Sequence, residues 1–211
     1  MSVPPKLIVV DGPRGIGKST LIANLQRLLT AKGLNVVYLP ERLDMWTNWC
    51  GENELKRTIE KGDNRFFFQS LVLHSYKVSL QSAFKTKPNA IILERWPGSA
   101  VHVFSEMALR DKKMSVGEVQ LIKELSKDFP KPTMIIGLWC SNYCTVRDRV
   151  NARTVENTSE EWTEQIYKMY GEYFTTLSGD SNYNFVSLDT GCSPETVARK
   201  AVANVESLFS N

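Results

Sequence analysis

Short apolar runs alternate with longer amphipathic stretches along the whole chain. Five runs have the length and the flanking turn residues of buried strands. Between them, apolar residues recur at the three- and four-residue spacing of helices. The pattern predicts strands at residues 7–10, 35–39, 90–93, 133–139 and 185–188. It predicts helices at residues 18–32, 66–84, 99–109, 116–125, 143–153 and 162–177, and a last helix after Ser193.

This alternation of strand and helix predicts an α/β fold. Parallel strands need a crossover between them, and helices that cover both faces of the sheet provide it. We therefore expect a five-stranded parallel sheet covered by helices on both faces. The chain has 211 residues, with no internal repeat and no linker that divides it, so a single domain over residues 1–211 is expected.

The composition is ordinary for a globular protein, with 42% hydrophobic and 23% charged residues. No apolar run approaches the roughly 18 residues of a membrane span, so no membrane partner is expected. The net charge of +3 is too small, without a clustered basic face, to indicate a nucleic-acid partner. The first residues show no signal or transit pattern, and a cytoplasmic location is the expectation.

The cysteines do not indicate a metal site. The chain has four cysteines and two histidines, without the closely spaced ligand pairs of a zinc site. Cys140 and Cys144 could pair, but free thiols in a reducing compartment are the favoured interpretation.

Residues 12–19 read G-P-R-G-I-G-K-S and match the phosphate-binding pattern G-x-x-x-x-G-K-[ST]. The segment lies between a predicted strand and a predicted helix, as its mechanism requires. Its glycines let successive amides point at phosphates, and the helix N-terminus adds positive charge. Lys18 would contact the β- and γ-phosphates, and the Ser19 hydroxyl would bind Mg²⁺. We expect a site for a nucleoside triphosphate made by Gly12, Pro13, Arg14, Gly15, Ile16, Gly17, Lys18, Ser19 and Thr20.

Charged side chains follow the predicted strands at the edge where ligands of parallel sheets collect. Asp11 follows the first strand, Glu41 and Arg42 the second, and Glu94 and Arg95 the third. One acid could accept a hydroxyl proton, another could hold magnesium, and an arginine could offset charge on a phosphoryl group. This combination favours a kinase over solvated strand ends.

Several segments, in this order, resemble the deoxynucleoside kinase family, which includes the thymidine kinases of herpes-type viruses. The resemblance covers about residues 6–177. It rests on D-G-P at residues 11–13 with the loop that follows, P-E at 40–41 with Trp46, F-F-F-Q-S at 66–70, E-R-W-P-G-S-A at 94–100 and R-D-R-V-N-A-R-T-V-E at 147–156. It implies a P-loop kinase with a small LID at about residues 147–160, and a homodimer formed through the long helices that flank the third strand.

The resemblance also implies roles at the nucleoside. Glu41 would be the base toward the 5′-hydroxyl, and Trp46 would be a wall of the sugar and base pocket. Gln69 would pair with a pyrimidine ring, since an amide donates and accepts at once. Phe104 would stack on the base, and the small Ala100 would leave room for a 5-methyl group. The implied activity is ATP-dependent phosphorylation of the 5′-hydroxyl of a deoxynucleoside, with thymidine or another pyrimidine preferred.

Further roles concern the phosphates and the sugar. Glu94 would bind Mg²⁺ together with Ser19, and Arg95 would contact the 5′-oxygen and the phosphate. The LID arginines Arg147, Arg149 and Arg153 would close over ATP, and Glu156 would hold the 3′-hydroxyl. The chain departs from the family pattern at Asn151, where another LID arginine is usual, at Trp96, and near Ile59, where a tyrosine is frequent. Tyr76 and Ala100 stand in place of an Asp/Arg pair that cytosine- and purine-accepting members use.

Two alternatives stay open from the sequence. A thymidylate kinase would share the fold and the loop, but it needs a further basic group for the acceptor's phosphate, for which Arg42 or Arg65 is available. A GTPase-like switch is less favoured, because the chain lacks N-K-x-D for guanine and D-x-x-G after the second strand.

Overall fold

The computed structural model describes residues 4–152 and 159–209, and its centre is a five-stranded parallel sheet in the order β2-β3-β1-β4-β5. All five strands lie within two residues of the predicted bounds, and the predicted α/β class is confirmed. The strands are β1 (Lys6–Asp11), β2 (Val36–Leu39), β3 (Ala90–Glu94), β4 (Met134–Trp139) and β5 (Phe185–Asp189).

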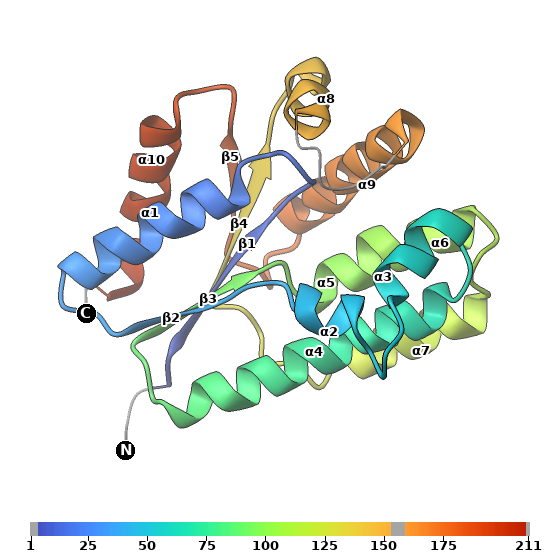
Figure 1. Cartoon of the computed structure of the whole chain (residues 1–211). Coiled ribbons are helices and arrows are strands. Elements are labelled where there is room, and N and C mark those ends of the chain that lie inside the picture. The colour runs from blue at the N-terminus through green and yellow to red at the C-terminus, as the bar shows by residue number, and fades with distance from the viewer. Residues whose placement is uncertain (1–3, 153–158, 210–211) are drawn as a thin grey trace.

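Successive residues of β1 are buried on opposite faces of the sheet, because side chains alternate along a strand. Ile8 and Val10 pack into one apolar core with helices α1 (Lys18–Ala31), α8 (Tyr143–Asn151) and α10 (Pro194–Glu206). Leu7 and Val9 pack into the other, with α4 (Arg65–Lys85), α7 (Val116–Ser126) and α9 (Glu160–Gly179). Figure 1 shows α1 and α10 on one side of the sheet and α4, α7 and α9 on the other. Both faces of β1, the central strand, are therefore buried, which explains its uninterrupted apolar run.

Local signals in the sequence begin several helices. Ser193 accepts a hydrogen bond from the Thr196 amide, and Pro194 is the first residue of α10. Ser115 and Glu118 form a reciprocal capping box at the start of α7. These caps satisfy amides that would otherwise lack partners at the helix ends.

The segment predicted as a helix at residues 99–109 is helical, but it is not a single α-helix. The segment contains a short helix α5 (Pro97–Ser99), a wider π-helical stretch η2 (Ala100–Ser105) and α6 (Glu106–Arg110). A π turn contains more residues than an α turn, and such turns are frequent at functional sites. Apolar periodicity over a few residues does not distinguish the two turns.

Short elements between β2 and α4 were not predicted. They are α2 (Leu43–Thr47), α3 (Glu54–Lys56) and the π-helical η1 (Arg57–Lys61), and a 3₁₀ turn η3 (Ser207–Phe209) follows α10. Each has at most five residues, which is too short for a periodic apolar pattern.

No helix in residues 4–152 and 159–209 is long and apolar enough to cross a membrane. In the same residues no group of three or more His, Cys, Asp or Glu is placed to hold a metal ion. Cys50, Cys140, Cys144 and Cys192 are free thiols, and only Cys140 is buried.

Candidate active site

The loop between β1 and α1 turns on glycines. Gly12, Gly15 and Gly17 have φ of 148°, 76° and 105°, values that other residues rarely adopt. A Cβ on Gly12 would lie 2.7 Å from the carbonyl oxygen of Leu138, and one on Gly15 would lie 2.7 Å from Cγ2 of Val150. The loop thus passes too close to β4 and α8 for any side chain at these two positions.

Lys18, the first residue of α1, points back over this loop. Its Nζ donates to the carbonyl oxygens of Gly12 at 3.2 Å and Pro13 at 3.1 Å, and it lies 4.0 Å from Glu94 Oε1. Only 7% of the side chain is exposed. Burial, and then the nearby Arg95 charge, lower the pKa of Lys18 to about 8. The ammonium is therefore poorly solvated at the centre of the loop.

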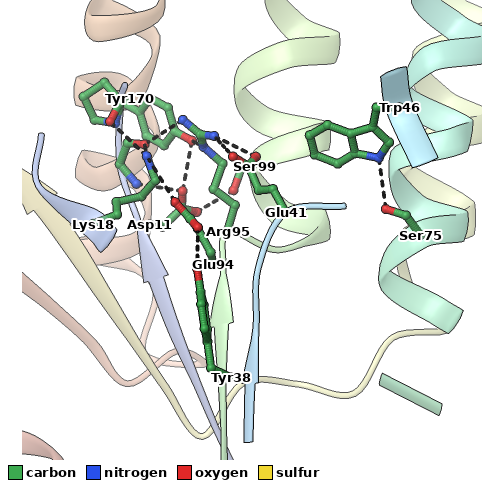
Figure 2. Close-up of polar contacts among 12 residues, drawn as sticks. Asp11, Lys18, Tyr38, Glu41, Trp46, Ser75, Glu94, Arg95, Ser99 and Tyr170 are labelled. Atoms are coloured by element: carbon green, nitrogen blue, oxygen red, sulfur yellow. Dashed lines mark hydrogen bonds and ion pairs between the residues drawn. The ribbon is translucent and has the colours of Figure 1, made fainter. Parts of the chain in front are cut away.

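Arg95 joins the loop to the acid that follows β2. One Nη atom lies 2.7 Å from both carboxylate oxygens of Glu41, and the other donates to the Gly12 carbonyl at 3.2 Å. Nε donates to the Tyr170 hydroxyl at 2.8 Å (Figure 2). The Arg95 backbone has a φ of 56°, a strained value for a residue with a side chain, and such strain concentrates at functional sites.

A buried carboxylate fixes Arg95 from behind. Asp11 accepts hydrogen bonds from the Gly12 amide at 2.8 Å, the Ser99 hydroxyl at 2.5 Å and the Tyr170 hydroxyl at 2.9 Å. Burial raises the pKa of Asp11, while these hydrogen bonds and Arg95 act in the opposite direction. The chain Asp11–Tyr170–Arg95 links the end of β1 to α9, and Figure 2 shows Arg95 between Tyr170 and Glu41.

Glu94 ends β3 beside the phosphate loop. Its Oε2 accepts a hydrogen bond of 2.8 Å from the Tyr38 hydroxyl on β2, the neighbouring strand. Burial and this hydrogen bond raise the pKa of Tyr38, so the phenol keeps its proton. Glu94 and Ser19 line one cavity, and Mg²⁺ is usually held by one or two carboxylates together with phosphate oxygens. The oxygen donors present fit that ion.

The structure collects most of the predicted acceptor residues around one cavity of about 250 Å³, called the first cavity below. The first cavity extends from the phosphate loop to helices α4 and α9. Trp46 on α2 forms one wall, where its indole Nε1 donates to Ser75 Oγ at 3.2 Å (Figure 2). The predicted residues that line the first cavity are Arg14, Gly15, Gly17, Lys18, Ser19, Glu41, Trp46, Gln69, Glu94, Arg95, Ala100 and Phe104.

A second cavity lies on the other side of the phosphate loop. Its lining includes Thr20 and Arg149, which were predicted to bind ATP, and Thr190 and Cys192, which follow β5. Arg149 Nη2 donates to the Thr190 carbonyl at 3.4 Å. The cavity is continuous with the loop through Gly15, Ile16 and Gly17, which suits the base of a bound nucleotide.

Other predicted residues are placed differently. Arg147 lines neither cavity, and its guanidinium contacts Asp148 at 3.2 Å and Glu160 at 3.5 Å. The Ile16 side chain is fully buried in the α1 core, so this residue can offer a ligand mainly its backbone. Arg153 and Glu156, and with them the centre of the predicted LID, lie outside the described residues.

Sequence reasoning missed several residues at the site. In the sequence, Tyr38 and Tyr170 look like apolar positions of a strand and a helix, and Ser99 looks like an ordinary helix start. Thr58 and Trp162 also line the first cavity. The only signal was position, because Tyr38 lies three residues before Glu41 in the segment that leads to the site.

A parallel sheet whose first strand runs through a glycine loop into a helix, with a buried lysine over that loop, defines a P-loop nucleotide-binding fold. The sequence pattern of the family described as "Deoxynucleoside kinase" matches residues 8–207. The chain therefore belongs to the deoxynucleoside kinase family, a class of phosphotransferase enzymes. This membership removes the support for a GTPase-like switch.

Two relatives in sequence are kinases. The chain is 41% identical over 97 residues to the thymidine kinase of Ictalurid herpesvirus 1 (strain Auburn), a match that covers 45% of this chain and 39% of the viral protein. It is 25% identical over 211 residues to a probable thymidylate kinase of Sulfurisphaera tokodaii, with 97% of each chain covered. The match to the viral kinase thus spans about two-fifths of that protein's length.

Two solved structures share the fold. Both are of deoxyadenosine kinase from M. mycoides, and in each comparison 95% of this chain and 99% of the other are covered. The structure with bound dCTP has a TM-score of 0.68 at 18% identity. The structure with the products dCMP and a flexible dCDP has a TM-score of 0.75 at 17% identity.

Proposed function

We propose that this protein transfers the γ-phosphoryl group of ATP to the 5′-hydroxyl of a deoxynucleoside, with thymidine preferred. The observation that carries the proposal is the pair Glu41 and Arg95. The pair lies in the first cavity, which also contains Lys18 at the phosphate loop and Gln69 on α4. Phosphoryl transfer to an alcohol needs a base for the hydroxyl proton and positive charge for the phosphate oxygens. The carboxylate supplies the first, and the arginine and the lysine in the same cavity supply the second.

Glu41 is the base in this proposal. It takes the proton of the 5′-hydroxyl as that oxygen forms a bond to the γ-phosphorus, and the bond from the γ-phosphorus to the β–γ bridging oxygen breaks to release ADP. Arg95 holds Glu41 through Nη1, and its charge offsets the negative charge that develops on the transferred group. Lys18, beside the phosphate loop, would contact oxygens of the transferred phosphoryl group.

Mg²⁺ fits beside the loop, with Ser19 and Glu94 as the residues that would hold it. The ion would supply positive charge to the phosphate oxygens. Thr20 and Arg149 of the second cavity would hold the ATP base and its phosphates. The roles given above to Arg147, Arg153 and Glu156 remain predictions.

The thymidine preference is supported by the shape and polarity of the first cavity. Gln69 can pair with a ring N–H and a carbonyl at once. Phe104 offers an aromatic face, and the small Ala100 leaves space for a methyl group. Tyr76, a large side chain that is also buried, lines the same cavity.

Thymidylate as acceptor is the second candidate, favoured by the relative from Sulfurisphaera tokodaii described as a probable thymidylate kinase. Its phosphate would need a basic partner near the site of transfer. Arg42 is tied to Asp44 by contacts of 2.6 to 3.1 Å and does not line the first cavity. Arg65 does line the first cavity. On α4, however, Arg65 lies eleven residues, or about 16 Å along the helix axis, before Tyr76, which lines the same cavity. Neither arginine supports a phosphate next to Glu41.

Product formation from nucleosides and monophosphates with ATP and Mg²⁺ tests the proposal. We expect Glu41→Gln to lower kcat with thymidine by about 10² to 10⁴, the usual contribution of a general base. The variant should also melt below the wild type, because it removes the charge paired with the buried Arg95. Glu164→Gln, at an exposed ion pair with Lys168, is the matched control and should keep full activity. If Glu41→Gln retained most of its activity with thymidylate as acceptor, the second candidate would replace the first.

We also propose a homodimer formed through α4 and α7. Phe84, Leu121 and Leu125 are large apolar side chains on these helices with 38 to 47% of their surface exposed. A second copy would cover them, since exposed apolar groups of this size favour association. Leu125→Glu should yield monomers in sedimentation velocity, and Lys123→Glu on the same helix should not. A monomeric wild type would contradict the proposal.

A further inference from the structure

Several buried polar atoms without a hydrogen-bond partner belong to residues that line the first cavity. Five side chains have such an atom within the described ranges, and four of them line this cavity. They are Thr58 Oγ1, Arg65 Nε, Gln69 Oε1 and Trp162 Nε1. Burying a polar group without a partner costs free energy, so four together indicate a ligand that pairs with them.

Arg65 is the unexpected member of this group. Its exposed fraction is only 7%, and no hydrogen bond or ion pair joins its guanidinium to another described residue. Asp111, at the end of α6, attracts it from a distance, but Asp111 Oδ1 already accepts a 2.7 Å hydrogen bond from Gln165 on α9. Burial lowers the pKa of Arg65, although an arginine stays protonated at any physiological pH. A buried guanidinium can only donate, so its partner must be an acceptor.

The order of residues along α4 places Arg65 in the cavity. Tyr76 lines the first cavity together with Glu41 and Arg95. Gln69 is almost two turns closer to the helix N-terminus, and Arg65 is one further turn, about 6 Å, beyond Gln69. In the proposed function the nucleoside has its 5′-oxygen at Glu41 and its base at Gln69. Arg65 then faces the part of the base farthest from the sugar.

In a pyrimidine nucleoside that part is the substituent at C4, across the ring from the sugar-bearing nitrogen. Thymine and uracil have a carbonyl oxygen there, which accepts hydrogen bonds. Cytosine has an amino group, which donates. A guanidinium can only donate hydrogen bonds. It therefore pairs with the 4-carbonyl oxygen of thymine or uracil and cannot pair with the 4-amino group of cytosine.

We propose that Arg65 determines base specificity by donating a hydrogen bond to the 4-carbonyl oxygen of a diketo pyrimidine whose N3–H is accepted by Gln69. The inference rests on the proposed function, because it takes the 5′-oxygen to lie at Glu41. Trp162 adds a second donor to the lining of the cavity, and Thr58 adds a hydroxyl. Arg65 does not touch the reacting atoms, so its effect falls on binding.

Steady-state kinetics with thymidine and deoxycytidine test the assignment. We expect Arg65→Met to lower kcat/KM for thymidine by about 10- to 100-fold, the effect of losing a hydrogen bond to a charged donor. The loss should appear in KM with kcat nearly unchanged, and deoxycytidine should change by less than about threefold. Arg65→Gln, whose amide can accept from an amino group, should raise kcat/KM for deoxycytidine. Arg110→Met, at an exposed ion pair with Glu172, is the control and should change neither substrate.

Thermal melting without nucleoside separates specificity from structure. A buried unpaired charge destabilises the fold, so Arg65→Met should melt at or above the wild-type temperature. A clear fall in melting temperature, an equal loss for both nucleosides or a loss confined to kcat would overturn the assignment while the proposed function stands. If the wild type phosphorylated no nucleoside, the proposed function would fail on its own. Calorimetric titration of thymidine and deoxycytidine would then decide on Arg65, and equal affinities, or a preference unchanged in Arg65→Met, would overturn it.

Discussion

The Tyr38 hydroxyl lies 2.8 Å from Glu94 Oε2, across the two neighbouring strands β2 and β3. On its other side Glu94 lies 4.0 Å from Lys18 Nζ. The carboxylate is therefore held between a neutral donor that fixes its orientation and a cation that belongs to the phosphate loop. A tyrosine that resembles a buried strand residue thus becomes part of the arrangement around the expected Mg²⁺ position.

Removing this hydroxyl should weaken the response to Mg²⁺. Groups that orient a metal-binding carboxylate commonly change metal affinity or activity by about 10- to 100-fold. We expect Tyr38→Phe to raise the Mg²⁺ concentration for half-maximal activity about tenfold and to leave the KM for thymidine within about twofold. Tyr183→Phe, at a phenol with no hydrogen-bond donation in the described part of the chain, should behave as the wild type. A Tyr38→Phe variant with an unchanged Mg²⁺ response would exclude this role.

The low pKa of Lys18, about 8, predicts a pH dependence of ATP use. As pH rises through this value, free enzyme loses the ammonium proton and with it the charge that attracts phosphate. We expect kcat/KM for ATP to be level below about pH 7.5 and to fall tenfold per pH unit well above 8, since this parameter reports the free enzyme. In the pH profile of kcat, the corresponding fall should occur at higher pH, because bound phosphate favours the charged form of Lys18. In Lys18→Arg, any remaining activity should lack the fall, and a level profile to pH 10 in the wild type would contradict the prediction.

The approach of the loop to α8 predicts an effect on stability. Gly15→Ala forces a φ of 76° on a residue with a side chain and brings its Cβ within 2.7 Å of Val150. The left-handed backbone alone costs about 1–2 kcal/mol. The melting temperature should therefore fall by roughly 2–8 °C in a chain of this size.

Two controls accompany that measurement in calorimetry. Gly117→Ala on α7, where nothing lies within 4 Å of the new Cβ, should instead keep or raise the melting temperature. Val150→Ala added to Gly15→Ala should recover the part of the loss that comes from the contact but not the part from the backbone. No fall in Gly15→Ala would show that the loop is free to move away from α8.

The fold could be predicted because its signals are local. The apolar run before Asp11, the helical spacing after Lys18 and the Ser193–Pro194 helix start each act within a few residues. Each is confirmed by β1, α1 and α10. The helix predicted at residues 99–109 is also present, but its π-helical stretch was not foreseen, because an α turn and a π turn differ by about one residue and apolar spacing does not resolve that difference.

The candidate site divides in the same way. The loop at residues 12–19 and the pairs Glu41–Arg42 and Glu94–Arg95 were visible because phosphate binding and strand ends impose short, ordered patterns. The strand-end pattern alone did not distinguish Arg42 from Arg95, and the family resemblance implied Arg95. In the structure Arg95 joins Glu41, whereas Arg42 turns to Asp44.

Local patterns in the sequence thus determined three features of this protein. These are the alternation of strands and helices, the phosphate loop, and the edge of the sheet at which acids and arginines collect. Contacts between distant segments were decided only by the tertiary structure. They include Tyr170 with Asp11, 159 positions apart, Tyr38 with Glu94, and Arg95 with Glu41. The reason is physical: burial removes water from a polar group wherever the chain folds over it, and the partner that replaces the water can come from any distance along the sequence.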